Sequence, residues 1–119
     1  MYKQCRTEQS AARQRQMEQG LVEIMGNARY EDITVSDLCE KMNIPRKSFY
    51  RYFSSKDGAL HGLIDHTLMD YEMFDLQSIR GGRTLEKELG RFFRFWHQQK
   101  LMLDALERSG LSGVLVVRA

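Results

Sequence analysis

Apolar residues recur at helical spacing along most of this chain of 119 residues, and that pattern predicts an all-helical fold. One helical stretch runs from about Gln9 to Ala28, a longer one from about Lys56 to Phe74, and another from about Leu85 to Arg108. A Gly-Gly pair at residues 81–82 interrupts the pattern between the last two stretches, and glycine pairs are strong breakers. We therefore expect a loop there.

The stretch between residues 34 and 57 follows a different pattern, with two short helices joined by a tight turn. Thr34 and Asp37 have the three-residue spacing of a capping box, which predicts the start of the first short helix. Asn43 tolerates the left-handed backbone conformation that a tight turn requires. Pro45 then opens a second short helix, which we expect to extend to Phe53. The arrangement is typical of a helix-turn-helix motif.

The flanks of this motif predict how it joins the rest of the chain. Ser54 and Asp57 have capping-box spacing and predict the start of the long helix. Phe49 and Phe53 are four residues apart, so they point in one direction, into a small core. Tyr30 and Ile33 are expected to close that core.

The basic residues are unevenly placed, although the net charge is only +2. Residues 1–56 hold ten basic and seven acidic residues, whereas residues 57–119 hold eight and nine. Five basic residues and no acidic residue lie between positions 41 and 56, and these are Lys41, Arg46, Lys47, Arg51 and Lys56. A short basic helix with neighbouring tyrosine hydroxyls suits contact with DNA phosphates and base edges. The alternative is a solvated basic face, but its coincidence with a helix-turn-helix favours DNA binding.

Here the sequence resembles a known family. The run NIPRKSFYRYFSSKDGAL, residues 43–60, resembles the recognition helix and following cap of the TetR-type (tetracycline-repressor-like) family of transcriptional regulators. Eight positions match that family's pattern: Ile44, Phe49, Tyr50, Tyr52, Phe53, Lys56, Asp57 and Leu60. The segment from Ile33 to Leu38 resembles the family's approach to the turn, and the likeness covers about residues 13–72. Three positions depart from the pattern: Asn43 replaces the turn glycine, Arg29 a helix-ending glycine, and Pro45 the usual Ser or Thr cap.

The resemblance implies an all-α fold with two parts. Residues 1–55 would form a three-helix DNA-binding unit with the helix-turn-helix, and residues 56–119 a linking helix plus the start of a helical effector and dimerisation domain. Effector domains of the family are usually longer, so we expect a chain truncated inside this domain, or else a fragment or an unusually short member of the family. By family analogy, Val114, Leu115, Val116 and Val117 would start another helix.

The residues expected to touch DNA fall into two groups. Arg46, Lys47 and Ser48 lie near the start of the recognition helix, where side chains reach base edges. The resemblance places phosphate contacts on Tyr50, Tyr52, Lys56 and, with less support, on Thr34 and Ser36. Core packing is an equal alternative for Tyr52, and Arg51 could face either way. The candidate DNA-binding residues are therefore Thr34, Ser36, Arg46, Lys47, Ser48, Tyr50, Arg51, Tyr52 and Lys56.

An apolar, aromatic-rich set follows in the second part of the chain. The resemblance implies that such residues line a small-molecule pocket, and the candidates are Met69, Met73, Phe93, Trp96 and His97. Their spacing favours plain core packing over a ligand site. His61 and His66 are five residues apart, which is unsuited to two metal ligands on one helix face, so no metal or other cofactor is expected.

Other features of the sequence limit which classes of protein this chain could belong to. No nucleophile motif, glycine-rich phosphate loop or carboxylate pair is present, so an enzyme is the weakest hypothesis. No apolar run approaches the length of a membrane span, and the N-terminus lacks the apolar segment of a signal peptide. Cys5 and Cys39 do not have the spacing of a metal or redox site. A cytoplasmic setting is therefore expected. Residues 1–8 are polar and predict a mobile arm; its Lys3 and Arg6 could enter a minor groove, but fraying is the commoner behaviour.

The combined reading is a sequence-specific DNA-binding transcriptional regulator, in particular a ligand-responsive repressor. A homodimer would read a palindromic operator in double-stranded DNA through the recognition helix at residues 45–53, and a small-molecule effector would release it. The alternative is a helical protein–protein interaction module, or a truncated regulator that pairs with a partner chain, because an apolar face left uncovered between Leu85 and Leu106 would seek a partner.

Overall fold

The computed structural model describes residues 2–78, 85–111 and 113–114, except for the side chains of residues 74–78, 85 and 88. The described residues form six α-helices and one short 3₁₀ helix, and contain no β-strand. The elements in chain order are α1 (Glu8–Met25), η1 (Tyr30–Asp32), α2 (Val35–Met42), α3 (Arg46–Tyr50), α4 (Lys56–Ser78), α5 (Leu85–Gln98) and α6 (Lys100–Arg108). The predicted all-α fold is confirmed, whereas the loop expected around residues 81–82 and most of the helix expected after residue 113 lie outside the described residues.

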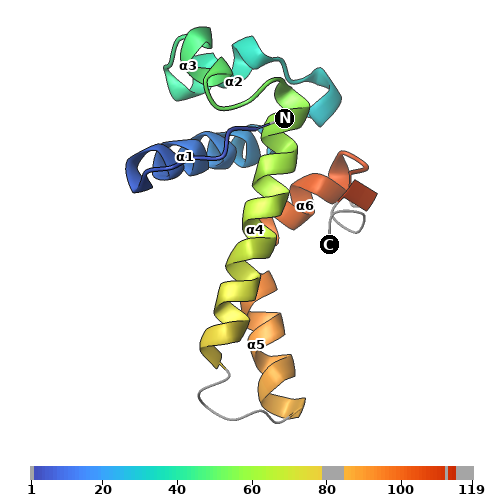
Figure 1. The fold of residues 1–119 in the computed structure, drawn as a ribbon. Helices are drawn as coiled ribbons and strands as arrows, with labels where there is room; N and C mark the ends of the chain where they lie inside the picture. Colours follow the sequence, from blue (N-terminus) through green and yellow to red (C-terminus); the bar gives the residue numbers. More distant parts are fainter. Residues whose placement is uncertain (1, 79–84, 112, 115–119) are drawn as a thin grey trace.

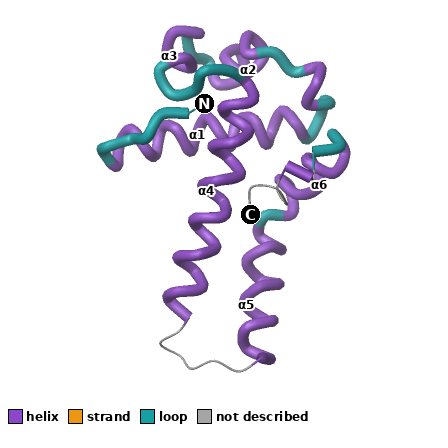
Figure 2. The backbone as a smooth tube through the Cα atoms, turned by 45° about the vertical axis from the view of Figure 1, so that its right-hand side comes forward, coloured by secondary structure: helices purple, strands orange, loops and turns teal. Residues whose placement is uncertain are grey.

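The long helix α4 is the axis on which the other helices are arranged (Figure 1). Helices α2 and α3 lie at its first end, and α1 crosses it below them. Helix α5 runs beside the far end of α4, and α6 then turns back toward α1, which it contacts (Figure 2). The helix-turn-helix thus lies at one end of α4, and α5 packs beside the other end.

One apolar core joins the two parts of the chain. Its largest fully buried side chains include Phe49, Phe53, Leu21, Leu38, Ile64 and Leu106. Tyr30 and Ile33 also belong to this core, as predicted. Ile64 comes from α4 and Leu106 from α6, so helices beyond residue 55 complete the core of the DNA-binding unit.

The predicted helix from Leu85 to Arg108 is in fact two helices. Gln99, with φ −95° and ψ 14°, separates α5 from α6. The change of direction lets α6 bury Met102 and Leu106 against the core, which a straight helix continuing along α4 would not do. Gly110 follows α6 with φ 71°, the left-handed conformation expected of a glycine that ends a helix.

One other predicted boundary was wrong. The recognition helix α3 ends at Tyr50, not Phe53, and Pro45 caps it in an extended conformation. The side chain that caps α4 belongs to Ser55, whose Oγ accepts from the backbone N–H of Gly58 at 3.1 Å. Helix α4 begins at Lys56, as predicted, and Ser55 is the residue directly before it.

The N-terminal arm is packed against the protein rather than mobile. The backbone N–H of Lys3 donates to the carbonyl of Tyr52 at 2.7 Å, and the Tyr2 hydroxyl donates to Asp65 at 2.7 Å. The Gln14 amide, which is buried, donates to the carbonyl of Lys3 at 2.9 Å. Three elements thus hold a segment whose polar composition gave no sign of burial.

A buried acid–histidine pair links α1 to α4. Glu18 is 1% exposed, and His66 Nδ1 lies 2.9 and 2.7 Å from its two carboxyl oxygens. Burial raises the pKa of Glu18 above its ordinary value, while the hydrogen bond and charge of His66, and the charge of Arg15, act in the opposite direction. The charge of Asp70 adds to the upward shift.

Stability should depend on pH through Glu18. A carboxyl whose pKa is raised by folding contributes stability that is fully present below its ordinary pKa of 4.5 and is lost as pH rises through the folded-state pKa. Glu18→Gln removes this titration. We expect the melting temperature of the wild type, relative to that of Glu18→Gln, to fall as pH rises from 4.5 toward neutrality. Circular-dichroism melts of both proteins across this range would measure it; a difference that does not change with pH would contradict the raised pKa.

Gly62 allows α1, α4 and the arm to approach closely. A Cβ at Gly62 would lie 2.9 Å from Glu18 Oε2 and 3.3 Å from Tyr2 Cγ. The Glu18 carboxyl is held by His66 and cannot swing away. Overpacking costs about 1–3 kcal/mol and alanine returns about 1 kcal/mol of helix propensity, so Gly62→Ala should lower the free energy of unfolding by about 1 kcal/mol.

The matched control for this substitution is Gly90→Ala in α5. A Cβ at Gly90 would meet no atom of the described residues within 4 Å, so only the gain in helix propensity is expected to apply. The free energy of unfolding should rise by up to about 1 kcal/mol. Urea titrations of both variants test the pair, and equal effects of the two changes would show that Gly62 is not sterically constrained.

Candidate nucleic-acid interface

The helix-turn-helix is built from a capped helix, a left-handed turn residue and a second, very short helix. Thr34 Oγ1 accepts from the backbone N–H of Asp37 at 3.0 Å, and Asp37 Oδ2 accepts from that of Thr34 at 2.9 Å. This is the predicted capping box, and the bond from the Thr34 backbone lowers the pKa of Asp37. Asn43 ends α2 with φ 54° and ψ 49°, as the sequence predicted for the turn.

Helix α3 is oriented by its one buried side chain. Phe49 is 1% exposed, and its ring packs 5.2 Å from that of Phe53. Phe49 points inward, so Lys47, two residues earlier, lies on the opposite side of the helix and is exposed. Arg46, the first residue of α3, is also exposed, and Tyr50 is 47% exposed. Side chains near the start of such a helix are the ones that can reach base edges in a major groove.

The five basic residues of the 41–56 stretch are not equivalent. Lys41 lies 3.6 Å from Glu23 in an ion pair, and Lys56 is held by backbone carbonyls. Arg46, Lys47 and Arg51 are exposed, and their side chains make no hydrogen bond or ion pair with any described residue. The positive charge offered to a partner is therefore concentrated on α3 and its C-cap.

Lys56 fastens the η1 turn to the start of α4. Its Nζ donates to the carbonyl of Tyr30 at 2.8 Å and to that of Ile33 at 2.9 Å, and lies 4.2 Å from the centre of the Tyr30 ring. Two of the three ammonium donors are used in this way. Asp57 accepts from the Tyr30 hydroxyl, and burial together with Asp57 raises the pKa of Tyr30.

The remaining predicted DNA contacts occupy different positions. Thr34 and Ser36 are exposed at the start of α2, on the same motif as α3. Ser48 is half-buried, and so is Tyr52, whose carbonyl is taken by the arm and whose ring lies 5.7 Å from Lys3 Nζ. The sequence did not predict that Lys56 would bind the carbonyls of Tyr30 and Ile33, or that the arm would bind the carbonyl of Tyr52. No local sequence pattern indicates contacts between segments so far apart in the chain.

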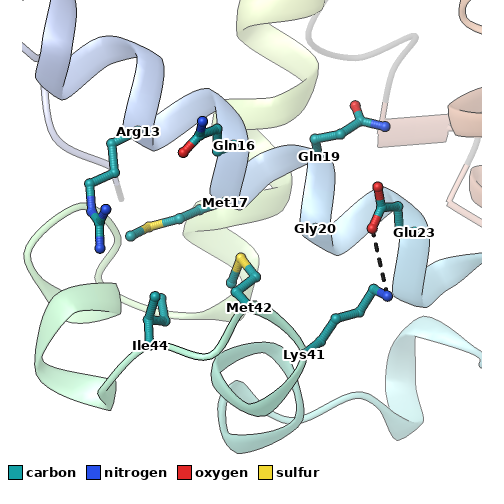
Figure 3. Close-up of a pocket in the computed structure, with 9 residues that line it drawn as sticks. All are labelled: Arg13, Gln16, Met17, Gln19, Gly20, Glu23, Lys41, Met42 and Ile44. Atoms are coloured by element: carbon teal, nitrogen blue, oxygen red, sulfur yellow. Dashed lines mark ion pairs between the residues drawn. The ribbon is translucent and has the colours of Figure 1, made fainter.

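A groove of about 410 Å³ lies between α1 and α2 (Figure 3). Gly20 brings the helices together here, since a Cβ would lie 2.7 Å from Met42 Sδ. The ion pair of Lys41 with Glu23 lies at one side and Arg13 at the other. The groove was not predicted, and its close packing sets the distance of α2 from the bracing helix α1.

The predicted ligand residues do not converge on an enclosed cavity. Met69, Met73 and Phe93 are 55%, 58% and 64% exposed, and His97 is also exposed. Trp96 is half-buried, and its ring lies 5.6 Å from that of Tyr71. The buried aromatic residue of α5 is Phe95, at 5% exposure, which the sequence pattern overlooked.

Metal chemistry and membrane insertion find no support in the part of the chain that the structure covers. Within residues 2–78, 85–111 and 113–114, no group of three or more histidine, cysteine or acidic residues could hold a metal ion. His66, one of the two histidines considered above, is engaged with Glu18. No helix among these residues is both long enough and apolar enough to cross a bilayer.

These features define a helix-turn-helix DNA-binding domain with a basic recognition helix. Residues 22–62 match the family model described as bacterial regulatory proteins, tetR family. The match extends from α1 through η1, α2 and α3 into α4, so this segment is a TetR-family N-terminal DNA-binding domain, as the sequence resemblance indicated. The family consists of transcription regulators, not enzymes. None of the curated proteins compared with the chain matches it.

The turn at Asn43 can be tested by two substitutions at one exposed site. A residue with a Cβ and no local hydrogen-bonding side chain is strained at φ 54°. Asn43→Ala should therefore lower the free energy of unfolding by about 1 kcal/mol. Asn43→Gly, the matched control, should leave it unchanged within a few tenths or raise it, because glycine adopts this conformation freely. Thermal melts compare the two, and the opposite order would contradict a left-handed turn.

Proposed function

We propose that this protein is a ligand-responsive repressor that reads a palindromic operator as a homodimer through α3. The TetR-family domain makes the protein a DNA-binding transcription regulator. The observation that carries the finer proposal is the orientation of α3: Phe49 is buried in the core, while Arg46, Lys47 and Arg51 are exposed and unpaired among the described residues.

The contacts with DNA divide by position on the motif. Arg46, at the first position of α3, would donate two hydrogen bonds to a guanine edge, with Lys47 and Ser48 reading neighbouring bases. Tyr50 and Arg51, and Thr34 and Ser36 at the start of α2, would bind phosphates and set the register of the motif. Lys56 would add one phosphate contact through its third N–H, and Tyr52 would add its hydroxyl.

A homodimer is supported by an exposed apolar surface far from α3. We call it the α4–α5 surface, and it consists of Met69, Met73, Leu89, Phe92 and Phe93. Patches of this kind mark interaction sites on soluble proteins. A second copy packed here would place two reading helices on one duplex, as a palindromic operator requires.

Repression that responds to a ligand would use the same end of the molecule. Met69, Met73, Phe93, Trp96 and His97 would lie at or beside the dimer contact, where flexible methionines can adapt to a small apolar molecule. Helix α4 runs from this surface to Lys56 beside the motif. A ligand that prefers a different spacing of the two copies would thereby shift the population away from the DNA-binding arrangement.

A second candidate function is favoured by the same surface. Its five large apolar side chains are each more than 40% exposed, so the protein could serve as a helical interaction module that pairs with a different chain. We place domain limits for either function at residues 1–55 and 56–119, with α4 as the linking helix. The mass of the protein in solution distinguishes a homodimer from a monomer that awaits a partner.

Replacement of Arg46 tests the proposed function directly. Fluorescence anisotropy would measure binding to duplex DNA from the protein's own upstream region and to a random duplex, at two salt concentrations. Wild type should bind both, with tighter, saturable binding to the upstream duplex and steep salt dependence. Arg46→Ala should weaken binding to the upstream duplex by about 1–3 kcal/mol through a single base pair.

The matched control is Arg94→Ala, which removes the same charge from an exposed position on α5. It should leave both affinities unchanged. Equal weakening on both duplexes by Arg46→Ala, with a salt slope reduced by about 1, would make Arg46 a phosphate contact. A wild-type monomer that binds no DNA above the random duplex would contradict the proposal and support the interaction module.

A further inference from the structure

The N-terminal arm, residues 2–5, is attached to the segment that follows the recognition helix. Tyr2 and Phe53 form an isolated antiparallel bridge, and the backbone N–H of Lys3 donates to the carbonyl of Tyr52 at 2.7 Å. The Lys3 ammonium also lies 5.7 Å from the centre of the Tyr52 ring. The arm therefore holds the backbone two and three residues beyond the end of α3.

The other side of the arm is attached to α4 and α1. The Tyr2 hydroxyl donates to Asp65 at 2.7 Å, and its ring meets the edge of His66 with centroids 5.3 Å apart. Gln14, which is 2% exposed, donates to the carbonyl of Lys3 at 2.9 Å and accepts from the Cys5 thiol. A Cβ at Gly62 would lie 3.3 Å from the Tyr2 ring, so this ring is closely packed.

Helix α3 depends on such external support. It has only five residues, and an isolated helix of that length is unstable in water. Within the helix, the burial of Phe49 anchors one side of it in the core. At the second, C-terminal end, the support comes from the buried Phe53 and from the bond of Lys3 to the Tyr52 carbonyl. Tyr2 connects this second end to α4, the helix that carries the rest of the molecule.

We propose that Tyr2 is a positioning residue for DNA reading, which fixes the direction of α3 by tying its C-terminal end to Asp65 and His66 on α4. It acts through Tyr52 and Phe53 and does not itself touch DNA. The proposal rests on the DNA-reading role of α3 stated above. It differs from the minor-groove role expected for Lys3 and Arg6, since Tyr2 is half-buried and contacts the protein itself.

The first test compares Tyr2→Ala and Tyr2→Phe in the full chain by DNA binding. Tyr2→Ala should lower affinity for the upstream duplex by about tenfold, the loss expected when one base contact is misplaced. Its affinity for a random duplex should fall much less than that for the upstream duplex, and its salt slope should stay at the wild-type value, because no charged group is removed. Tyr2→Phe keeps the ring against His66 and should therefore retain most of the difference in affinity between the upstream and the random duplex.

Two further variants separate positioning from direct DNA contact and from a general loss of stability. Lys3→Ala removes the charge of the arm and should leave the salt slope unchanged; a slope reduced by about 1, with equal losses on both duplexes, would mean that the arm binds DNA directly and would overturn the proposal. Leu103→Ala loosens the core from α6, away from the arm. If it reduces the preference for the upstream duplex as much as Tyr2→Ala does, the effect is one of stability alone and the proposal fails.

A measurement without DNA keeps this proposal distinct from the proposed function. In ¹H–¹⁵N spectra of the free protein, Tyr2→Ala should shift the backbone amide signals of Arg51, Tyr52 and Phe53 and leave those of α5 in place. Unmoved signals at these three residues would overturn the positioning role whatever the DNA result. If the wild type does not prefer the upstream duplex but Tyr2→Ala still shifts these three signals, the proposed function is contradicted. The structural link from Tyr2 to the end of α3 would then still hold.

Discussion

The burial of Phe49 and Phe53 is the contact on which the reading surface depends. Both side chains are almost fully buried in a core shared by α1, α2, α4 and α6. Helix α3 has too few residues to be stable alone, so this burial fixes both its existence and its orientation. Because Phe49 points inward, Lys47, two residues earlier, lies on the opposite face of the helix. Arg46 is exposed at the first position of α3, where DNA can reach it.

Several polar contacts join the same unit to α4. Lys56 bonds two carbonyls at the η1 turn, His66 pairs with the buried Glu18 of α1, and Tyr2 links Asp65 to the end of α3. Buried polar groups of this kind are stabilising only when their partners stay in place. A rotation or shift of α4 would therefore act on all three at once, which gives a physical route from the far end of α4 to the recognition helix.

The far end of α4 carries exposed apolar side chains in place of the polar contacts found at its start. The α4–α5 surface is apolar and exposed, and behind it Tyr71 packs against Phe95 and Trp96. The molecule thus presents a basic surface at one end and an apolar surface at the other, connected by one long helix. Under the proposed function these two surfaces would be coupled, and α4 is the element that extends from one to the other.

Local chemistry in the sequence determined the capping box at Thr34 and Asp37, the left-handed turn at Asn43, the buried Phe49 and the identity of the domain, since each depends on residues close together in the chain. Only the tertiary structure decided the break at Gln99, the choice of Phe95 over Phe93 as the buried ring, and the attachment of the arm to α4. It likewise directed Lys56 to two carbonyls and His66 to Glu18. Those outcomes depend on atoms from distant segments, and hydrophobic periodicity carries no information about which segment a side chain will meet.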